Sequence, residues 1–246
     1  MTITTTGIAF LISSAGLAFC SIRFFEAFKN VGAVRPSRKM GILLSSFFAI
    51  LSLQHGVIFL GSLFLGNSSG GLLLVNVVDV LVLAVASSLG VYAMFYIVFP
   101  KVSPWPSVIS TFLFGLFVAM LIYFSGSEPY INLAGNIDWD FSRESAYGFL
   151  YLLWVSMLAP VVIFGKNYLI SASRKAKLVS FILVLVHFIG MINVFLLMSK
   201  YIFSSKTTEI FLFDRLLLLI GVIFVLTFFG APSIHKLKER HTGGQI

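Results

Sequence analysis

The chain has 246 residues, of which 59% are hydrophobic and only 11% are charged. Soluble globular domains carry about 25% charged residues, so this composition excludes an ordinary soluble protein. The formal net charge of +8 would suit nucleic-acid binding, but no basic cluster belongs to a folded soluble domain, and we expect no nucleic-acid partner.

Seven apolar stretches are each long enough to cross a bilayer, because about 20 helical residues span the roughly 30 Å hydrocarbon core. In chain order they cover residues 5–25, 40–64, 72–98, 106–125, 146–165, 178–199 and 210–231. The sequence therefore predicts an all-α integral membrane protein, with a seven-transmembrane-helix bundle in residues 1–234. Residues 235–246 form a basic tail that anionic membrane lipid would attract.

Basic residues gather on alternate connections between these stretches. If seven helices alternate in direction, one side carries Arg23, Lys29, Arg35, Arg38, Lys39, Lys101, Lys166, Arg174, Lys175, Lys177, Lys236, Lys238 and Arg240. Connections rich in Lys and Arg stay on the cytoplasmic side during insertion. We therefore expect the N-terminus outside and the C-terminus in the cytoplasm, with the chain in a bacterial cytoplasmic membrane.

One connection, residues 125–145, is much longer than the others, and we expect it outside. It is acidic and contains apolar and aromatic residues, namely Tyr130, Ile131, Leu133, Trp139 and Phe141. Loops of this length in a compact domain are often lids or binding loops. Trp and Tyr also favour the membrane interface. A lid and an interfacial anchor both fit this segment.

A faint internal repeat relates the first three stretches to the last three. Ser37-Arg38-Lys39 matches Ser173-Arg174-Lys175, His55 matches His187, and Asp79 matches Asp214, at offsets that agree to about one helical turn. Such a 3+1+3 parallel repeat is typical of transporters, which bind solutes at the repeat interface.

Polar residues at membrane depth are costly and usually face the bundle interior or a cavity. On the second stretch, Ser45, Ser52, His55 and Ser62 fall within about a third of the helix circumference. The residues that we expect to line an outward-facing pocket are Asp79, Asn76, His55, Asn193, Asp214, Arg215 and His187. The sequence favours Arg215 as the residue that forms an ion pair with Asp79.

Several known chemistries can be weighed against this pattern. A retinal protein needs a lysine in the last helix, and the sequence has none between Lys206 and Lys236. A zinc hydrolase or a bis-histidine haem protein would have to use His55 and His187, but no His-rich motif accompanies them. A non-enzymatic protein without a metal or another cofactor is therefore favoured, either a receptor-like or sensory protein or a small-solute or proton-coupled transporter.

The layout of a basic loop ending at Arg38-Lys39, a short turn Asn67-Ser-Ser-Gly-Gly and a helix ending at Phe99-Pro100 resembles a known class. It is similar to the seven-helix N-terminal membrane modules of bacterial sensor kinases and cyclases. The resemblance implies a sensory role with a small-molecule ligand. No kinase or cyclase domain follows His235, so a signal would pass to a separate cytoplasmic partner at the basic loops.

Overall fold

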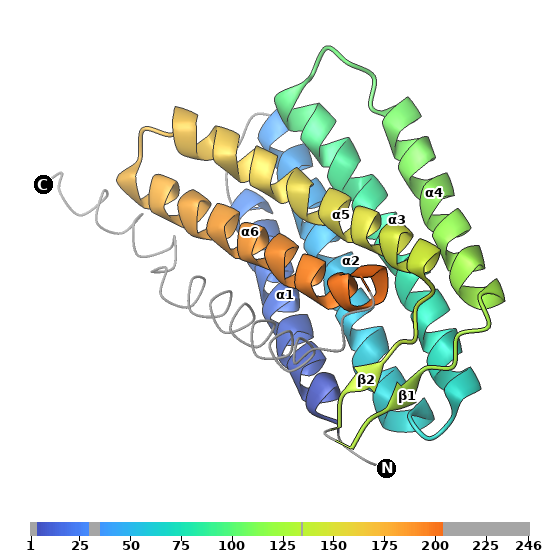
Figure 1. Ribbon diagram of the computed structural model, residues 1–246. Helices are drawn as coiled ribbons and strands as arrows, with labels where there is room; N and C mark the ends of the chain where they lie inside the picture. The colour runs from blue at the N-terminus through green and yellow to red at the C-terminus, as the bar shows by residue number, and fades with distance from the viewer. Residues whose placement is uncertain (1–3, 30–34, 134, 204–246) are drawn as a thin grey trace, which may run out of the picture.

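The computed structural model describes residues 4–29, 35–133 and 135–203. These residues form an all-α bundle of six helices, each long and apolar enough to cross a membrane (Figure 1). The helices are α1 (Thr5–Lys29), α2 (Arg35–Leu65), α3 (Ser69–Val98), α4 (Trp105–Phe124), α5 (Arg143–Ile170) and α6 (Arg174–Phe203). They confirm six of the predicted stretches as helices, while the seventh stretch, 210–231, and the tail lie outside the described residues.

The helices begin and end where local chemistry permits. In hydrocarbon every backbone polar group must be satisfied internally, which a long helix achieves except at its ends. Ser68 caps α3 by accepting a hydrogen bond from the backbone N–H of Gly71 at 3.1 Å, and Ser142 caps α5 in the same way from Ser145 at 3.2 Å. Pro106 lies in the first turn of α4, where a missing N–H costs nothing.

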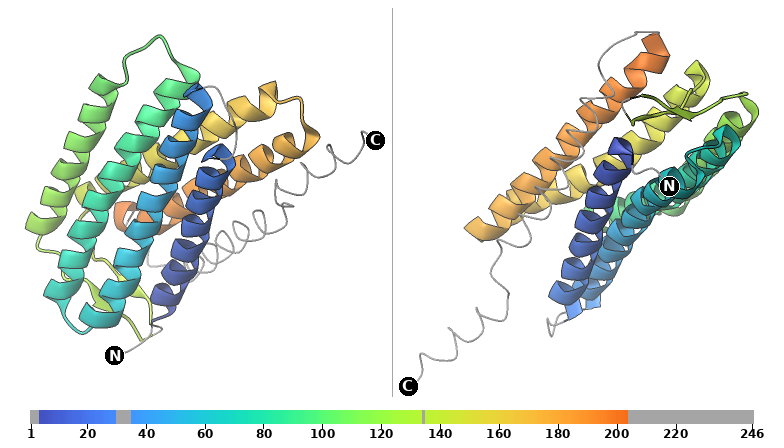
Figure 2. Two further views of the ribbon diagram at one scale, coloured as in Figure 1. Left: turned by 180° about the vertical axis from the view of Figure 1, so that it is seen from behind. Right: turned by 90° about the horizontal axis from the view of Figure 1, so that it is seen from below.

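The helices form two layers. Helices α1 to α4 lie side by side in chain order, and the pair α5 and α6 crosses them as a second layer (Figure 2). Helix α3 is central because it packs against α2, α4 and α5. The two layers therefore meet most closely along α3 and α5.

Small residues allow this close approach along α4. A Cβ atom added at Gly115 of α4 would lie 2.2 Å from the Ala84 side chain of α3. A Cβ added at Gly148 of α5 would lie 2.6 Å from Val118 of α4. Without a hydrophobic driving force between helices in lipid, such close packing is a main source of association.

Two reciprocal serine pairs join α1 to α2. The Ser14 hydroxyl lies 2.8 Å from the Ser52 carbonyl oxygen, and the Ser52 hydroxyl lies 2.8 Å from the Ser14 carbonyl oxygen. Ser21 and Ser45 repeat this arrangement seven residues along each helix, at 2.8 and 2.9 Å. Ser45 and Ser52, which the sequence places on one polar line with His55, thus serve the contact between α1 and α2.

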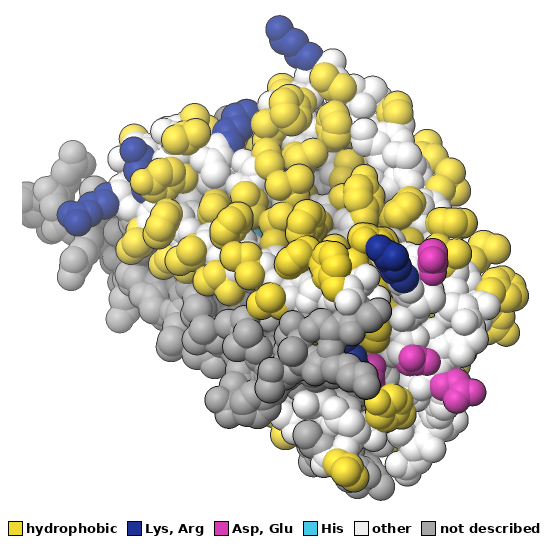
Figure 3. Space-filling view, viewed as in Figure 1, with side chains coloured by type: hydrophobic (Ala, Val, Ile, Leu, Met, Phe, Trp, Pro, Cys, Tyr) yellow, Lys and Arg dark blue, Asp and Glu magenta, His cyan; other side chains and the backbone are white. Residues whose placement is uncertain are grey.

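Charged side chains divide between the two ends of the bundle (Figure 3). The basic end, as we call it, carries the connections between α1 and α2, α3 and α4, and α5 and α6. There the Lys166 ammonium donates to the Ile97 carbonyl oxygen at 2.9 Å, and the Lys39 ammonium lies 4.6 Å from the centre of the Tyr96 ring. The opposite end, which we call the acidic end, carries Glu128, Asp138, Asp140 and Glu144, together with Arg143 and Lys200.

The loop at the acidic end contains a small antiparallel ribbon. Strands β1 (Tyr130–Ile131) and β2 (Ile137–Asp138) pair with Tyr130 opposite Asp138. Two-residue strands have no detectable period, so the sequence could not predict them. The ribbon gives the 125–142 loop a defined shape over the helix ends.

We expect the serine pairs to be coupled in stability. Interhelical hydrogen bonds in membrane proteins average about 0.6 kcal/mol. Ser14→Ala and Ser52→Ala should each lower the free energy of unfolding, because each removes a hydroxyl bonded to a carbonyl oxygen of the other helix. The two hydroxyls also lie 3.2 Å apart, so the double variant should lose about 0.5 kcal/mol less than the sum of the two. Steric trapping in bicelles measures these values. Ser110→Ala is the matched control, since that hydroxyl bonds to Ser107 within α4; single variants of Ser14 and Ser52 that are as stable as Ser110→Ala would contradict the bonds between α1 and α2.

Candidate functional site

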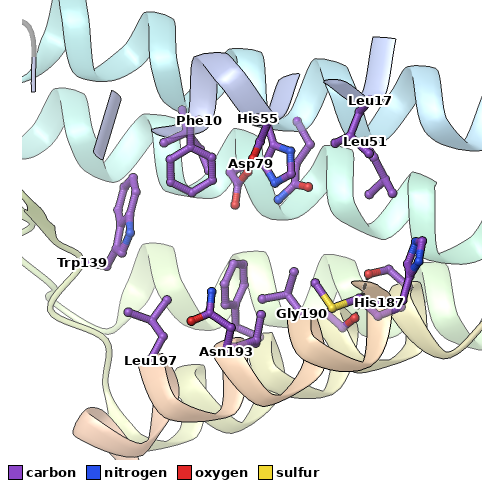
Figure 4. Close-up of a pocket in the computed structure, with 18 of the residues that line it drawn as sticks. Phe10, Leu17, Leu51, His55, Asp79, Trp139, His187, Gly190, Asn193 and Leu197 are labelled. Carbon is purple, nitrogen blue, oxygen red and sulfur yellow. Dashed lines mark hydrogen bonds between the residues drawn. The ribbon is translucent and has the colours of Figure 1, made fainter. Parts of the chain in front are cut away.

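A cavity of about 100 Å³ lies between the two layers, towards the acidic end (Figure 4). Helices α1, α2 and α3 form one wall and α5 and α6 form the other, while the 125–142 loop adds two aromatic side chains. The lining consists of Phe10, Ser13, Leu17, Leu51, Gln54, His55, Ile58, Asn76, Asp79, Trp139, Phe141, Phe149, Leu153, Ser156, Met157, Val186, His187, Gly190, Asn193, Val194 and Leu197. Most of these side chains are apolar, so the few polar ones define the chemistry of the cavity.

Asp79 and Asn76 are the central polar pair. They lie one turn apart on α3 and are 2% and 1% exposed. Gln54 of α2 hydrogen-bonds to the Asp79 carboxyl group. The Oδ1 atom of Asp79 and the Nδ2 atom of Asn76 have no hydrogen-bond partner within the described part of the chain. Buried polar atoms in native proteins are nearly always paired, so these two indicate a place for a guest molecule or water.

His55 lies beside this pair on the same wall. Its ring centre is 5.2 Å from that of Phe10, and its Nδ1 atom is buried with no partner among residues 4–29, 35–133 and 135–203. Figure 4 shows Phe10, His55 and Asp79 facing the same space. The cavity wall around Asp79 therefore combines a carboxyl group, the amide of Asn76, the imidazole of His55 and the aromatic ring of Phe10.

The facing wall belongs to α6. Asn193 and Gly190 face the cavity there, and His187 lies further along the same helix (Figure 4). The Nδ1 atom of His187 lies 2.7 Å from the carbonyl oxygen of Leu183, which can only accept, so Nδ1 carries the proton. This bond fixes the orientation of the ring at the edge of the cavity.

Phenylalanines close the cavity towards the basic end. Phe48 stacks on Phe24 with ring centres 5.3 Å apart, and Phe47 meets Phe48 edge-on at 5.3 Å. The His187 ring lies against this cluster, 6.2 Å from Phe48 and 6.5 Å from Phe164. The cluster fills the space between the layers below the cavity, so the cavity occupies only the acidic half.

The 125–142 loop covers the cavity at the acidic end. Trp139 and Phe141 are 8% and 6% exposed and line the cavity from above. On one side the loop is attached to α1, where the Thr5 N–H donates to the Gly135 carbonyl oxygen at 3.1 Å. The Ile137 N–H also donates to the Thr6 hydroxyl at 3.2 Å. Of the two interpretations of this segment, buried aromatic rings favour a lid over an interfacial anchor, although Tyr130 and Leu133 remain exposed.

On the other side the loop is attached to α6 by a group that we call the latch: Asp138, Lys200 and Tyr201. The Lys200 ammonium forms a salt bridge with the Asp138 carboxylate, and the Tyr201 hydroxyl donates to Asp138 Oδ1 at 2.7 Å. The Trp139 N–H in turn donates to the Tyr201 oxygen at 3.2 Å. Phe141 meets the Tyr201 ring edge-on at 5.3 Å. The latch therefore positions both aromatic rings of the lid.

The latch keeps Asp138 ionised. Burial, the largest single effect, raises the pKa of Asp138, but hydrogen bonds from Lys200 and Tyr201 and the charge of Lys200 together outweigh it. The pKa of Asp138 therefore lies below its ordinary value. The same negative charge raises the pKa of the exposed Tyr130 hydroxyl, which donates to Asp138 at 3.3 Å.

The structure brings five of the seven predicted pocket residues to one cavity, namely Asp79, Asn76, His55, Asn193 and His187. Asp214 and Arg215 lie outside the described residues, and so does the predicted Asp79–Arg215 pair. Whether the five bind a ligand stays a prediction. Among described residues, no group of three or more His, Cys, Asp or Glu side chains is placed to hold a metal ion.

Sequence reasoning missed two parts of the site. Gln54 precedes His55 on α2 and carries the hydrogen bond to Asp79, and its polar side chain in an apolar run was a usable signal. The latch joins residues 62 positions apart, and no local pattern reports such a contact. No protein-family model matches the chain, and no curated protein shows significant sequence similarity to it.

We expect the latch to hold the lid. Asp138→Asn should lower the melting temperature by roughly 2–10 °C, because hydrogen bonds to charged groups contribute about 1.5–3 kcal/mol. It should also shift the Trp139 fluorescence emission to longer wavelength as the ring meets water. Asp140→Asn removes the same charge from an exposed neighbouring position and should change neither the melting temperature nor the emission wavelength. Equal effects of the two substitutions would show that Asp138 acts through the net charge of the loop and not through its bonds to Lys200 and Tyr201.

Acid should release the same latch. A carboxyl with a lowered pKa contributes its stability in full above its unfolded value, about 3.9, and loses it as the pH falls through the folded value. The melting-temperature difference between wild type and Asp138→Asn should therefore stay constant from about pH 7 to pH 5 and shrink below about pH 4. A difference that instead grew on acidification would contradict the latch.

Proposed function

We propose that this protein is a receptor-like or sensory integral membrane protein that binds a small molecule in the cavity beneath the 125–142 loop. The observation that carries the proposal is the Asp79 carboxyl group, 2% exposed, with one oxygen directed into the cavity without a partner among the described residues. An unpaired buried acid costs several kcal/mol, and proteins retain such groups mainly where a ligand compensates them.

The same proposal sets the orientation. The acidic end with its lid faces the outside, and the basic end faces the cytoplasm of a bacterial cell, because basic connections are retained there. The ligand then enters from outside under the lid. A signal reaches a separate cytoplasmic partner at the basic end, where Arg38, Lys101 and Lys177 are exposed. The resemblance to sensor modules supports the same direction of signalling.

We expect Asp79→Asn to separate stability from function. Asparagine has nearly the same shape without the charge, so the unliganded protein should be as stable as wild type or more stable by about 1 kcal/mol. Ligand response should be lost. Thermal unfolding in nanodiscs measures the stability of the unliganded protein. Asn76→Asp provides the opposite control, since a second acid at the site should lower stability; a large loss of stability in Asp79→Asn would instead assign Asp79 a structural role.

Cysteine accessibility tests the direction of entry. In a Cys20→Ala background, Ser156→Cys places a thiol on the cavity wall, because Ser156 lines the cavity and is 2% exposed. We expect the silver ion, a thiol-reactive cation small enough for the cavity, to react with it from the acidic side of proteoliposomes only, and faster when Asp138→Asn is added. Met120→Cys on the exposed face of α4 is the control and should not react in lipid.

The outcome also separates a receptor from a transporter. A transporter exposes its site alternately to both sides, so Ser156→Cys would be labelled from the basic side as well. Labelling from both sides would replace the receptor proposal by the transporter. No labelling from either side would contradict a water-accessible pocket and leave the polar residues as links between helices.

A further inference from the structure

We propose that the cavity takes a small organic cation, a primary ammonium with a short apolar body, whose charge pairs with Asp79. This inference rests on the proposed binding function and names its ligand class. It follows from the charge balance of the cavity, the character of its walls and its size.

The charge balance comes first. Asp79 is the only acid among the described lining residues, and none of those residues is Lys or Arg. The nearest described cations at the acidic end are otherwise engaged. Lys200 pairs with Asp138, and Arg143 lies 5.9 Å from the centre of the Tyr147 ring, outside the cavity lining. Gln54 offers Asp79 only a neutral hydrogen bond. No described Lys or Arg side chain therefore reaches Asp79, and a positively charged guest would supply its counter-charge; Arg215, the partner that the sequence suggests, lies outside the described residues.

The polar atoms around Asp79 suit an ammonium group. An ammonium has three donors and no acceptor. Asp79 Oδ1 can accept one of these, and His55 Nδ1, which is also without a partner in the described segments, can accept another in its neutral form. Asn76 Nδ2 is a donor with no partner among the described residues, so an oxygen on the guest could accept a hydrogen bond from it.

The walls favour an organic cation over a bare metal ion or an anion. Aromatic rings of Phe10, Trp139, Phe141 and Phe149 line the cavity. Their faces attract cations and pack against apolar carbon, whereas they repel anions. Figure 4 shows the Phe10 ring next to Asp79 and the Trp139 ring between the two walls. A guest can thus place its charge at Asp79 and its carbon chain against these rings.

The size limits the guest. A cavity of about 150 Å³ holds benzene, and this one has about 100 Å³, so four or five non-hydrogen atoms fit. Suitable probes are propylammonium and ethanolammonium, with 1-propanol as the neutral match and propionate as the anionic match. Such small molecules bind no more tightly than tens of micromolar, so titrations must extend through the millimolar range.

The experiment titrates these four probes into the full chain in phosphatidylcholine nanodiscs. Trp105→Phe and Trp154→Phe leave Trp139 as the only tryptophan, and its fluorescence reports occupancy. Sodium chloride at equal ionic strength is the salt control. We expect the two ammonium probes to bind at least tenfold more tightly than 1-propanol, and propionate not to bind. Ethanolammonium should lose affinity in Asn76→Leu, which removes the donor for its oxygen.

Two matched variants complete the test. Asp79→Asn should weaken ammonium binding at least tenfold and leave 1-propanol unchanged, while Asp140→Asn should bind all probes as wild type does. Binding of 1-propanol or propionate as tight as that of the ammonium probes would overturn the cation assignment and leave the binding pocket standing. If none of the four probes changed the fluorescence or the melting temperature, both the cation assignment and the proposed binding pocket would be overturned.

Discussion

A bundle in hydrocarbon must satisfy its polar groups from within, and this constraint governs the structure at every level. Serine hydroxyls bond across α1 and α2, and the Ser87 hydroxyl of α3 lies 3.2 Å from the Leu152 carbonyl oxygen of α5. Lys166 bonds to a carbonyl oxygen near the end of α3. Against this background one atom each of Asp79 and Asn76 stands out, because it is buried, lines the cavity and has no hydrogen-bond partner among the described residues.

The cavity exists because the two helix layers are filled differently at their two ends. Towards the basic end, large rings such as Phe48 and Phe164 occupy the space between the layers. Towards the acidic end the layers are bridged instead by the 125–142 loop, which bonds to Thr6 on α1 and Tyr201 on α6. A loop held at both edges by a few polar contacts can open at lower cost than packed rings can separate, because such contacts exchange readily with water. This difference in packing supports the proposed access route beneath the loop.

The sequence predicts the helices well and the site only in part. Apolar length alone identifies six helices, because only a helix can carry such a run across a bilayer. Helical periodicity places Asn76 and Asp79 on one inward face, and the cost of polar groups in lipid singles them out. Periodicity cannot say which neighbour a face meets. Ser52 and His55 lie one turn apart on α2, yet Ser52 bonds to α1 and His55 lines the cavity.

The three aspartates of the acidic half show why Asp79 carries the functional argument. Asp140 is exposed and caps a loop N–H, so water and a backbone bond satisfy it. Asp138 is largely buried but has Lys200 and Tyr201 as partners, so its charge is compensated inside the protein. Asp79 is the most deeply buried of the three, and among the described residues its one hydrogen-bond partner is the neutral Gln54. Of these three aspartates, only Asp79 lines the cavity, and one of its oxygens has no partner in the described part of the chain. An amide at that position could also bond to Gln54 without introducing an ionisable group among apolar side chains, so packing alone does not call for an acid there. The acid at this position therefore supports the proposal that a cationic ligand completes the site.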